Sequence, residues 1–275
     1  MQQPHSKTTD GRPPLSTLRV DKSLEGKAVI ITGGTSGLGR CIAIACARAG
    51  ARGILITGRN ATRGEETLTT IAREVVAAHG PSGVESSKIC ARAFVAVDLA
   101  DGEAAATKIM DAAVREFGTV DLLVNSAAAC FPRGDLETTT PELWDTMMDT
   151  NLKAPFLLTQ ALARHLKQRR ARGAVVNIGS CAAHGGAPFI LAYSCSKAAL
   201  ACFTKNTAAE LRPHGIRVNQ VNMGWCLTDA EDRGQSATNR FGWRKPTRRR
   251  RRGAFCGPRT RRPPSSTCSA RAPPW

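Results

Sequence analysis

Tyr193 and Lys197 stand four residues apart in a stretch with a helical pattern, so they share one face of the expected helix. A phenol normally titrates near about 10 and transfers protons poorly at neutral pH, but a neighbouring ammonium stabilises the phenolate. Ser180 follows the apolar run AVVNI at 174–178, where its hydroxyl could hold a substrate oxygen. Taken singly, Tyr193 fits a half-buried core aromatic and Lys197 a solvated charge. The combination predicts proton transfer to or from a small molecule.

A glycine-rich segment, TGGTSGLG, spans residues 32–39 directly after the first apolar run. Gly33, Gly37 and Gly39 are spaced to let the chain turn tightly and bring its backbone close to a dinucleotide. The helix expected to open near Gly37 would point N–H groups at a pyrophosphate. The alternative is a purely structural turn, but the strand before it and the helix after it favour cofactor binding.

The end of the second apolar run, Thr57-Gly58-Arg59-Asn60, indicates which cofactor is preferred. Enzymes that use NAD usually place a carboxylate there for the ribose hydroxyl, and this segment has none. Arg59 could instead hold a 2′-phosphate through charge-assisted hydrogen bonds, although it could also be a solvated loop residue. We therefore expect NADP(H) to be favoured over NAD(H).

The elements that must position these residues follow from hydrophobic periodicity. Short apolar runs predict buried strands, and amphipathic stretches between them predict helices. The alternation predicts an α/β fold, a doubly wound parallel sheet in a single domain over 27–232. The strands are expected at 28–32, 53–57, 93–97, 120–124, 174–178 and 216–221, and the helices at 37–49, 61–79, 101–117, 141–170 and 190–212.

Together these motifs resemble the short-chain dehydrogenase/reductase family, in its single-domain Rossmann branch. The resemblance runs from about Leu24 to Asp232. It rests on TGGTSGLG, Asp98-Leu99, NSAA at 125–128, Asn151, Ser180 and YSCSK at 193–197. It implies an NAD(P)-dependent enzyme that interconverts an alcohol and a carbonyl, with a small-molecule substrate. It also implies a homodimer or homotetramer formed through the helices at 141–170 and 190–212.

The resemblance implies a role for each matching position. Tyr193 would be the general acid or base, Lys197 would lower its pKa and bind the nicotinamide ribose, and Ser180 would orient the reacting oxygen. Asn151 would anchor a water in a proton relay, and these four form the expected catalytic set. The expected cofactor-binding set also contains Tyr193 and Lys197, and its other members are Thr32, Gly33, Thr35, Ser36, Gly37, Leu38, Gly39, Arg59, Asp98, Leu99, Asn125, Ala127 and Thr228.

The sequence departs from the family pattern in three places. Ala128 stands where the family has Gly, and Met223-Gly224 where it has Pro-Gly. After the sixth strand the family continues with a helix and a seventh strand, and the segment from residue 233 to 275 has the pattern of neither. The expected pocket, which includes Cys130, Phe131, Phe189, Ile190 and Trp225, is largely apolar and suits many neutral carbonyls.

The charge of the chain is concentrated in that last segment. Of its 39 Lys and Arg residues, 13 lie at 233–275, where there is no Asp or Glu, so residues 1–232 hold 26 basic and 22 acidic residues. We expect an Arg/Pro-rich disordered tail. It is either the result of a change of reading frame near Asp232 or a genuine basic tail with a function of its own. Two alternative functions follow: a cofactor-binding but inactive protein, and a basic-tailed nucleic-acid-associated protein. The basicity lies outside the predicted domain, so we do not expect nucleic acid as the partner.

The remaining composition favours a cytoplasmic protein. Residues 1–26 are polar, without the apolar centre of a secretory signal, and predict a flexible leader. No apolar run approaches the roughly 20 residues that span a bilayer. The ten cysteines show no C-x-x-C pair and no zinc-ligand spacing, so we expect reduced thiols and no metal.

Overall fold

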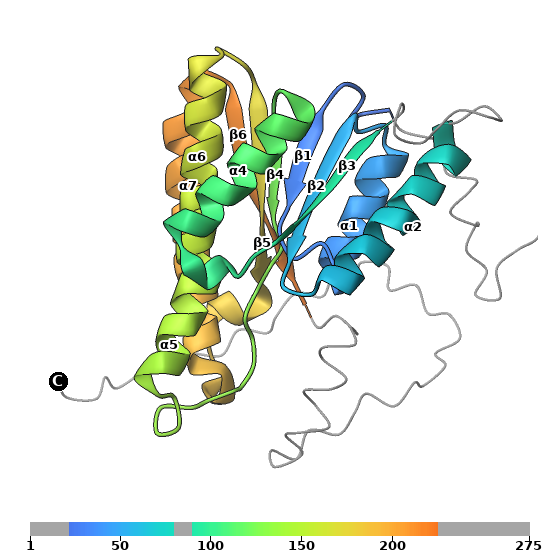
Figure 1. The fold of residues 1–275 in the computed structure, drawn as a ribbon. Helices are drawn as coiled ribbons and strands as arrows, with labels where there is room; N and C mark the ends of the chain where they lie inside the picture. Colours follow the sequence, from blue (N-terminus) through green and yellow to red (C-terminus); the bar gives the residue numbers. More distant parts are fainter. Residues whose placement is uncertain (1–21, 80–89, 225–275) are drawn as a thin grey trace, which may run out of the picture. The chain divides into compact units, whose positions relative to one another are not determined.

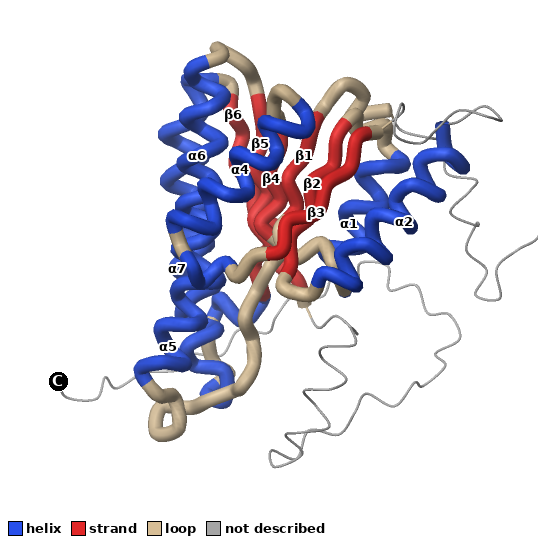
Figure 2. The backbone as a smooth tube through the Cα atoms, viewed as in Figure 1, coloured by secondary structure: helices blue, strands red, loops and turns tan. Residues whose placement is uncertain are grey.

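The computed structural model describes residues 22–79 and 90–224, which form one α/β unit. Its sheet has six parallel strands in the order β3-β2-β1-β4-β5-β6, as Figures 1 and 2 show. This order is that of a doubly wound nucleotide-binding fold, and it confirms the fold class expected from the sequence. The strands are β1 (Ala28–Ile31), β2 (Gly53–Gly58), β3 (Ala91–Ala96), β4 (Leu122–Asn125), β5 (Gly173–Ser180) and β6 (Ile216–Met223).

Helices cover both faces of the sheet, which is why its central strands are nearly continuous apolar runs. On one face lie α1 (Gly37–Arg48) and α2 (Ala61–His79), and on the other α4 (Glu103–Phe117), α6 (Ala154–Gln168) and α7 (Leu191–Leu211) (Figure 1). All four residues of β1 are buried; Val29 and Ile31 belong to one hydrophobic cluster, and Ile30 belongs to the other. The strand is therefore held from both sides.

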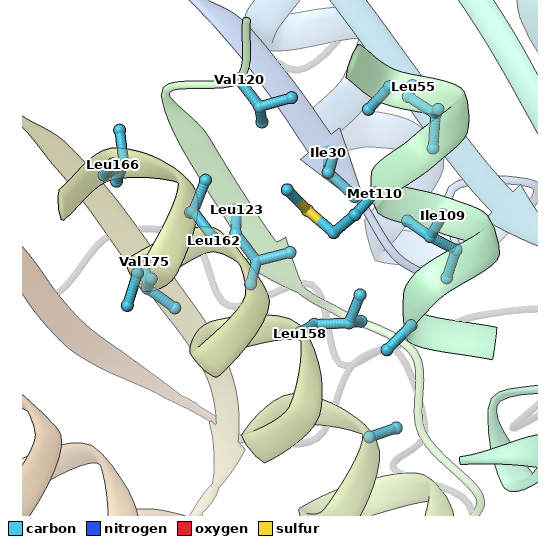
Figure 3. Packing of buried hydrophobic residues seen from close by; sticks show 14 of the residues in the cluster. Ile30, Leu55, Ile109, Met110, Val120, Leu123, Leu158, Leu162, Leu166 and Val175 are labelled. Atoms are coloured by element: carbon cyan, nitrogen blue, oxygen red, sulfur yellow. The ribbon is translucent and has the colours of Figure 1, made fainter. Parts of the chain in front are cut away.

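The larger cluster packs α4 and α6 against the central strands (Figure 3). Ile109 of α4 and Leu162 of α6 are fully buried there, with Ile30, Leu55 and Leu123 of the sheet. Burying one such side chain contributes about 1.5–3 kcal/mol. This packing fixes the carboxyl ends of β1, β2, β4 and β5 relative to one another. Those ends carry residues that the sequence predicts to act in catalysis or in cofactor binding.

The stretch expected as one helix at 141–170 is divided in the structure. A first helix, α5 (Pro141–Met148), begins after Thr140, whose side chain accepts a hydrogen bond from the Leu143 N–H at 3.2 Å. A π-helical turn, η3 (Asp149–Lys153), then connects it to α6. The single-helix expectation was wrong in this respect, because hydrophobic periodicity does not register one widened turn. Such turns are frequent at functional sites, and this one contains Asn151.

Three expectations fall on parts of the chain outside the described residues: the leader to residue 21, the tail at 233–275 and the site residue Thr228. Within the described ranges, no helix is long and apolar enough to cross a membrane. No cluster of His, Cys, Asp and Glu side chains suited to a metal ion occurs in residues 22–79 and 90–224.

Candidate active site

The loop between β1 and α1 approaches its neighbours so closely that it needs glycine. Gly33 has φ +66°, and a Cβ there would lie 2.8 Å from the Ala127 Cα. A Cβ on Gly39 would collide with the Gly33 carbonyl group. Gly37 has φ +51° and begins α1, whose first N–H groups have no partner within the helix. The loop is therefore a backbone cradle at a helix N-terminus, which suits a pyrophosphate.

Thr32 fastens this cradle to the next strand of the sheet. Its Oγ1 accepts hydrogen bonds from the N–H groups of Ser126 (3.0 Å) and Ala127 (3.1 Å), just after β4. Ala127 is the residue against which Gly33 packs. Three further expected cofactor residues, Thr35, Ser36 and Leu38, lie in the same loop or first helical turn, and Ser36 is exposed.

Arg59 and Asp98 lie beside each other beyond the ends of β2 and β3. Their side chains form an ion pair of 3.6 Å and are 81% and 44% exposed. Asp98 also accepts a hydrogen bond from the Ala100 N–H at 3.1 Å, which begins the turn containing the buried Leu99. An ion pair this exposed contributes only about 0–1 kcal/mol. A phosphate could therefore take the place of the carboxylate at Arg59.

Asn125, the last residue of β4, is part of a buried polar chain. Its side-chain N–H donates to Asn177 Oδ1 on β5 at 2.8 Å, and the Asn177 amide donates to Thr204 Oγ1 on α7 at 2.8 Å. The Asn125 Oδ1 atom is buried and has no hydrogen-bond partner. Buried polar atoms normally have one, so this oxygen fits a donor on a bound cofactor.

Sequence reasoning missed Asn177, which holds the Asn125 amide in place. The available signal was a lone amide inside the run AVVNI, at a position paired in register with Asn125.

Ser180, Tyr193 and Lys197 come together around the end of β5. Ser180 is its last residue, and its Oγ accepts a hydrogen bond from the Ala182 N–H at 3.1 Å. Tyr193 is half-buried in the first turn of α7. Lys197 follows one turn later, and its Nζ donates to the Ile178 carbonyl at 2.8 Å and lies 5.8 Å from the centre of the Tyr193 ring. The lysine therefore links the serine's strand to the tyrosine's helix.

Burial perturbs Lys197 strongly. The residue is 2% exposed, and desolvation of the ammonium lowers its pKa from 10.5 to about 8, opposed in part by an electrostatic interaction with the nearby Cys130. Shifts of this size concentrate where proton transfer occurs, although structural charges are also perturbed.

Asn151 is fully buried in the π-helical turn. Its Oδ1 accepts from the Ala129 N–H and its Nδ2 donates to the Ala129 carbonyl, both at 2.8 Å. The same Nδ2 donates to Ser196 Oγ at 3.0 Å, and Ser196 Oγ donates to the Tyr193 carbonyl at 2.8 Å. Asn151 thus contacts α7 through Ser196, a residue that sequence reasoning missed although it lies within YSCSK.

A small hollow of about 10 Å³ lies beside Tyr193. Its lining includes two residues expected from the sequence, Cys130 and Ile190, and the further lining residues are Pro132, Arg133, Gly134, Leu143, Met147 and Ala192. The expected Trp225 lies outside the described residues. A larger cavity of about 720 Å³ adjoins the first residues of β4, β5 and β6, at the opposite edge of the sheet, and contains none of the expected site residues.

Comparison with known proteins identifies the class of this chain. The family model described as short chain dehydrogenase matches residues 27–238, so the chain belongs to the short-chain dehydrogenase/reductase family of NAD(P)-dependent oxidoreductases. L-xylulose reductase of Bos taurus is 38% identical over 203 residues, which cover 74% of this chain and 73% of that protein. Dehydrogenase/reductase SDR family member 7B of Bos taurus is 37% identical over 78% of this chain, and the match spans only 62% of that relative's length.

Solved structures agree with the fold. A short-chain dehydrogenase from Burkholderia cenocepacia in complex with NADP superposes with a TM-score of 0.65 and 31% identity, covering 75% of this chain and 77% of that one. A 3-ketoacyl-(acyl-carrier-protein) reductase from Brucella melitensis, complexed with NADH, gives 0.65 and 29%, covering 75% and 78%. Relatives of this chain therefore bind either cofactor.

Proposed function

We propose that this chain interconverts an alcohol and a carbonyl, with Tyr193 giving a proton in reduction and taking one in oxidation. The observation that carries the proposal is the buried Lys197, one helical turn from Tyr193 and hydrogen-bonded to the strand that ends at Ser180. A cation fixed beside a phenol favours the phenolate, which a proton shuttle at neutral pH requires.

The other residues of the set hold the reacting groups in place. Ser180 Oγ stands at the carboxyl end of β5, where it would donate to the substrate oxygen and orient it toward Tyr193. Asn151 would support a proton route behind the tyrosine and keeps the π-helical turn attached to Ala129. A bound nicotinamide cofactor would supply or accept the hydride.

The residues present fit that cofactor. The Gly33–Gly39 cradle would hold the pyrophosphate, Asp98 the adenine, and the unpartnered Asn125 oxygen would face the nicotinamide half. We propose a preference for NADP(H), because Arg59 is exposed at the end of β2 and Gly58 provides no carboxylate to repel a 2′-phosphate.

The test of the catalytic proposal is Tyr193→Phe in the full chain, assayed by NADPH oxidation with a panel of ketones and aldehydes. Loss of general acid catalysis should lower kcat by about 10²–10⁴, while NADPH binding, measured by fluorescence titration, stays within about twofold. A Phe variant that keeps near-normal kcat contradicts the role of Tyr193. Cofactor binding without turnover by the unmodified chain would instead favour the inactive alternative.

The cofactor preference is tested with Arg59→Ala. Removing the guanidinium should weaken NADPH binding by about tenfold or more and leave NADH binding nearly unchanged. Arg63→Ala is the matched control, since Arg63 is an exposed arginine in the first turn of α2. Equal affinities of the unmodified chain for NADPH and NADH would refute the preference.

We also propose that the chain forms a homodimer or homotetramer through α5, α6 and α7. Trp144 and Phe156 are 36% and 41% exposed on the first two of these helices. Phe156 packs edge-on against Phe203 of α7, with ring centres 6.2 Å apart. These side chains supply apolar surface of the kind found at interfaces. A monomeric mass by light scattering at micromolar concentration would disprove this arrangement.

A further inference from the structure

The cavity of about 720 Å³ at the first residues of β4, β5 and β6 is rich in basic residues. Four of the residues that line it are positively charged: Lys27, Arg172, Arg212 and Arg217. They belong to different parts of the chain, which are the residue before β1, the residue before β5, the short turn η6 (Arg212–His214) after α7, and β6. The fold thus brings together cations that are far apart in the sequence.

The charge of these four side chains is not balanced within the described part of the chain. Each residue is exposed, and none of the four side chains forms a hydrogen bond or an ion pair with residues 22–79 or 90–224. Among the described lining residues the one acid is Asp121, and its carboxylate is already engaged. Its Oδ2 accepts a hydrogen bond from the Ala28 N–H at 2.9 Å and lies 3.5 Å from the Arg52 guanidinium. The cavity therefore carries an excess of positive charge.

The three arginines are held around one short turn of backbone. In the register of the sheet, Ala174 of β5 pairs with Arg217 of β6, so Arg172 lies beside the start of β6. A Cβ on Gly215 would lie 3.1 Å from the Arg172 Cγ, which shows that the aliphatic stem of this arginine packs over the glycine. The Gly215 N–H donates to the Arg212 carbonyl at 3.0 Å. Their proximity is thus fixed by the backbone.

The chemistry of the lining indicates which ligand fits. Guanidinium groups bind phosphate oxygens through paired, charge-assisted hydrogen bonds, and clustered cations that repel one another are stabilised by a bound anion. The volume is typical of a small-molecule site. No aromatic side chain is among the described lining residues, so a nucleobase would find no surface on which to stack. The segment 233–275 has no Asp or Glu with which to neutralise the cavity.

We propose that this cavity binds a small soluble polyphosphate, a molecule with two or more adjacent phosphate groups, through Arg172, Arg212 and Arg217, with Lys27 adding a fourth positive charge. The site is separate from the candidate active site, because Ser180 lies at the carboxyl end of β5 and the cavity adjoins the first residue of the same strand. A polyphosphate and a dinucleotide can therefore bind at the same time. The inference does not depend on the proposed oxidoreductase activity.

The test is calorimetric titration of the full chain with tripolyphosphate, with NADP⁺ present at saturation to occupy the cofactor cradle. We expect tripolyphosphate to bind at least about tenfold more tightly than inorganic phosphate, because several arginines contact one ligand. Replacing Arg172 and Arg217 together by Met should weaken the tightest binding event by on the order of tenfold or more. Replacing Arg73 and Arg115 by Met is the matched control, since these exposed arginines of α2 and α4 lie outside the cavity.

Two features of the design separate the cavity from other basic parts of the chain. The arginines at 248–252 also attract polyphosphate, but they are present in every variant, so the comparison between variants isolates the cavity. Thermal melting adds a second measurement: tripolyphosphate should raise the Tm of the wild type and of the control, and should not raise that of the Arg172→Met, Arg217→Met protein.

Three results would overturn the inference: no tighter binding of tripolyphosphate than of phosphate, unchanged affinity in a folded Arg172→Met, Arg217→Met protein, or an equal loss in the control. None of them bears on the proposed function, which is measured by carbonyl reduction in the absence of polyphosphate. Conversely, a chain without turnover that binds tripolyphosphate through these arginines would support the inference and remove the proposed function alone.

Discussion

Replacing Lys197 by Met should make the stability of this protein depend on pH in a specific way. Methionine matches the lysine stem in volume and removes the ionisable group. The folded chain buries the ammonium and lowers its pKa from 10.5 to about 8, whereas the unfolded chain keeps the ordinary value. Between these two values the unfolded state binds more protons than the folded state, so the wild-type protein gains stability as the pH rises.

The magnitude follows from the shift. Below pH 8 the wild-type protein bears nearly the full penalty of the buried charge, about 3 kcal/mol at 1.36 kcal/mol per pKa unit. At pH 10 about 1 kcal/mol of it remains, because the amine is then neutral in the folded state and partly neutral in the unfolded one. The hydrogen bond from Lys197 to the Ile178 carbonyl is available to the charged and the neutral amine alike, and it largely cancels in the comparison between the two pH values.

The assay is urea unfolding of wild type and Lys197→Met at pH 7 and pH 10, without cofactor. We expect the stability of the wild type relative to the variant to improve by about 2–2.5 kcal/mol at the higher pH. Lys108→Met is the control, because Lys108 also donates to a backbone carbonyl, that of Ala96 at 2.9 Å, but is exposed. A difference between wild type and Lys197→Met that is the same at both pH values would refute the argument from desolvation.

Two other predictions follow from the same region. Tyr193 is the only tyrosine in the chain, so its ionisation can be followed directly by the ultraviolet absorbance of tyrosinate. Lys197→Met should move that titration to higher pH, because the ammonium no longer stabilises the phenolate. An unchanged titration curve contradicts the proposed role of the lysine. Asn151→Ala should lower the free energy of unfolding by about 2–4 kcal/mol, because both backbone groups of Ala129 lose a buried partner. The exposed Asn206→Ala should change it by less than about 0.5 kcal/mol in the same urea experiment, and comparable losses in the two variants would contradict this account.

The elements of this fold could be predicted from the sequence because their signals are local. Each apolar run overlaps one of the six strands, and Gly37, predicted to open a helix, begins α1. The sheet edge that carries the candidate residues also follows from the sequence, since parallel strands place all their carboxyl ends together. The position of Tyr193 and Lys197 on one face of α7 could also be predicted, because residues four apart in a helix lie one turn apart on the same side.

What could not be predicted depends on contacts between distant residues. The hydrogen bond from Asn125 to Asn177 joins residues 52 positions apart, and that from Asn151 to Ser196 joins residues 45 apart. Local periodicity contains no information about such pairs.

The two halves of the candidate site differ in how firmly they are held. Around the proposed proton donor, Asn151, Lys197 and Asn177 are buried and hydrogen-bonded, and leaving such groups unpaired is costly. At the other end, Arg59 and Asp98 form an exposed pair that water and salt weaken. A change at Arg59 can therefore alter the choice of cofactor without moving Tyr193. The proposed proton transfer and the proposed cofactor selection would then be physically separable, because the hydrogen bonds from Asn125 through Asn177 to Thr204 connect β4, β5 and α7 but do not reach Arg59 after β2.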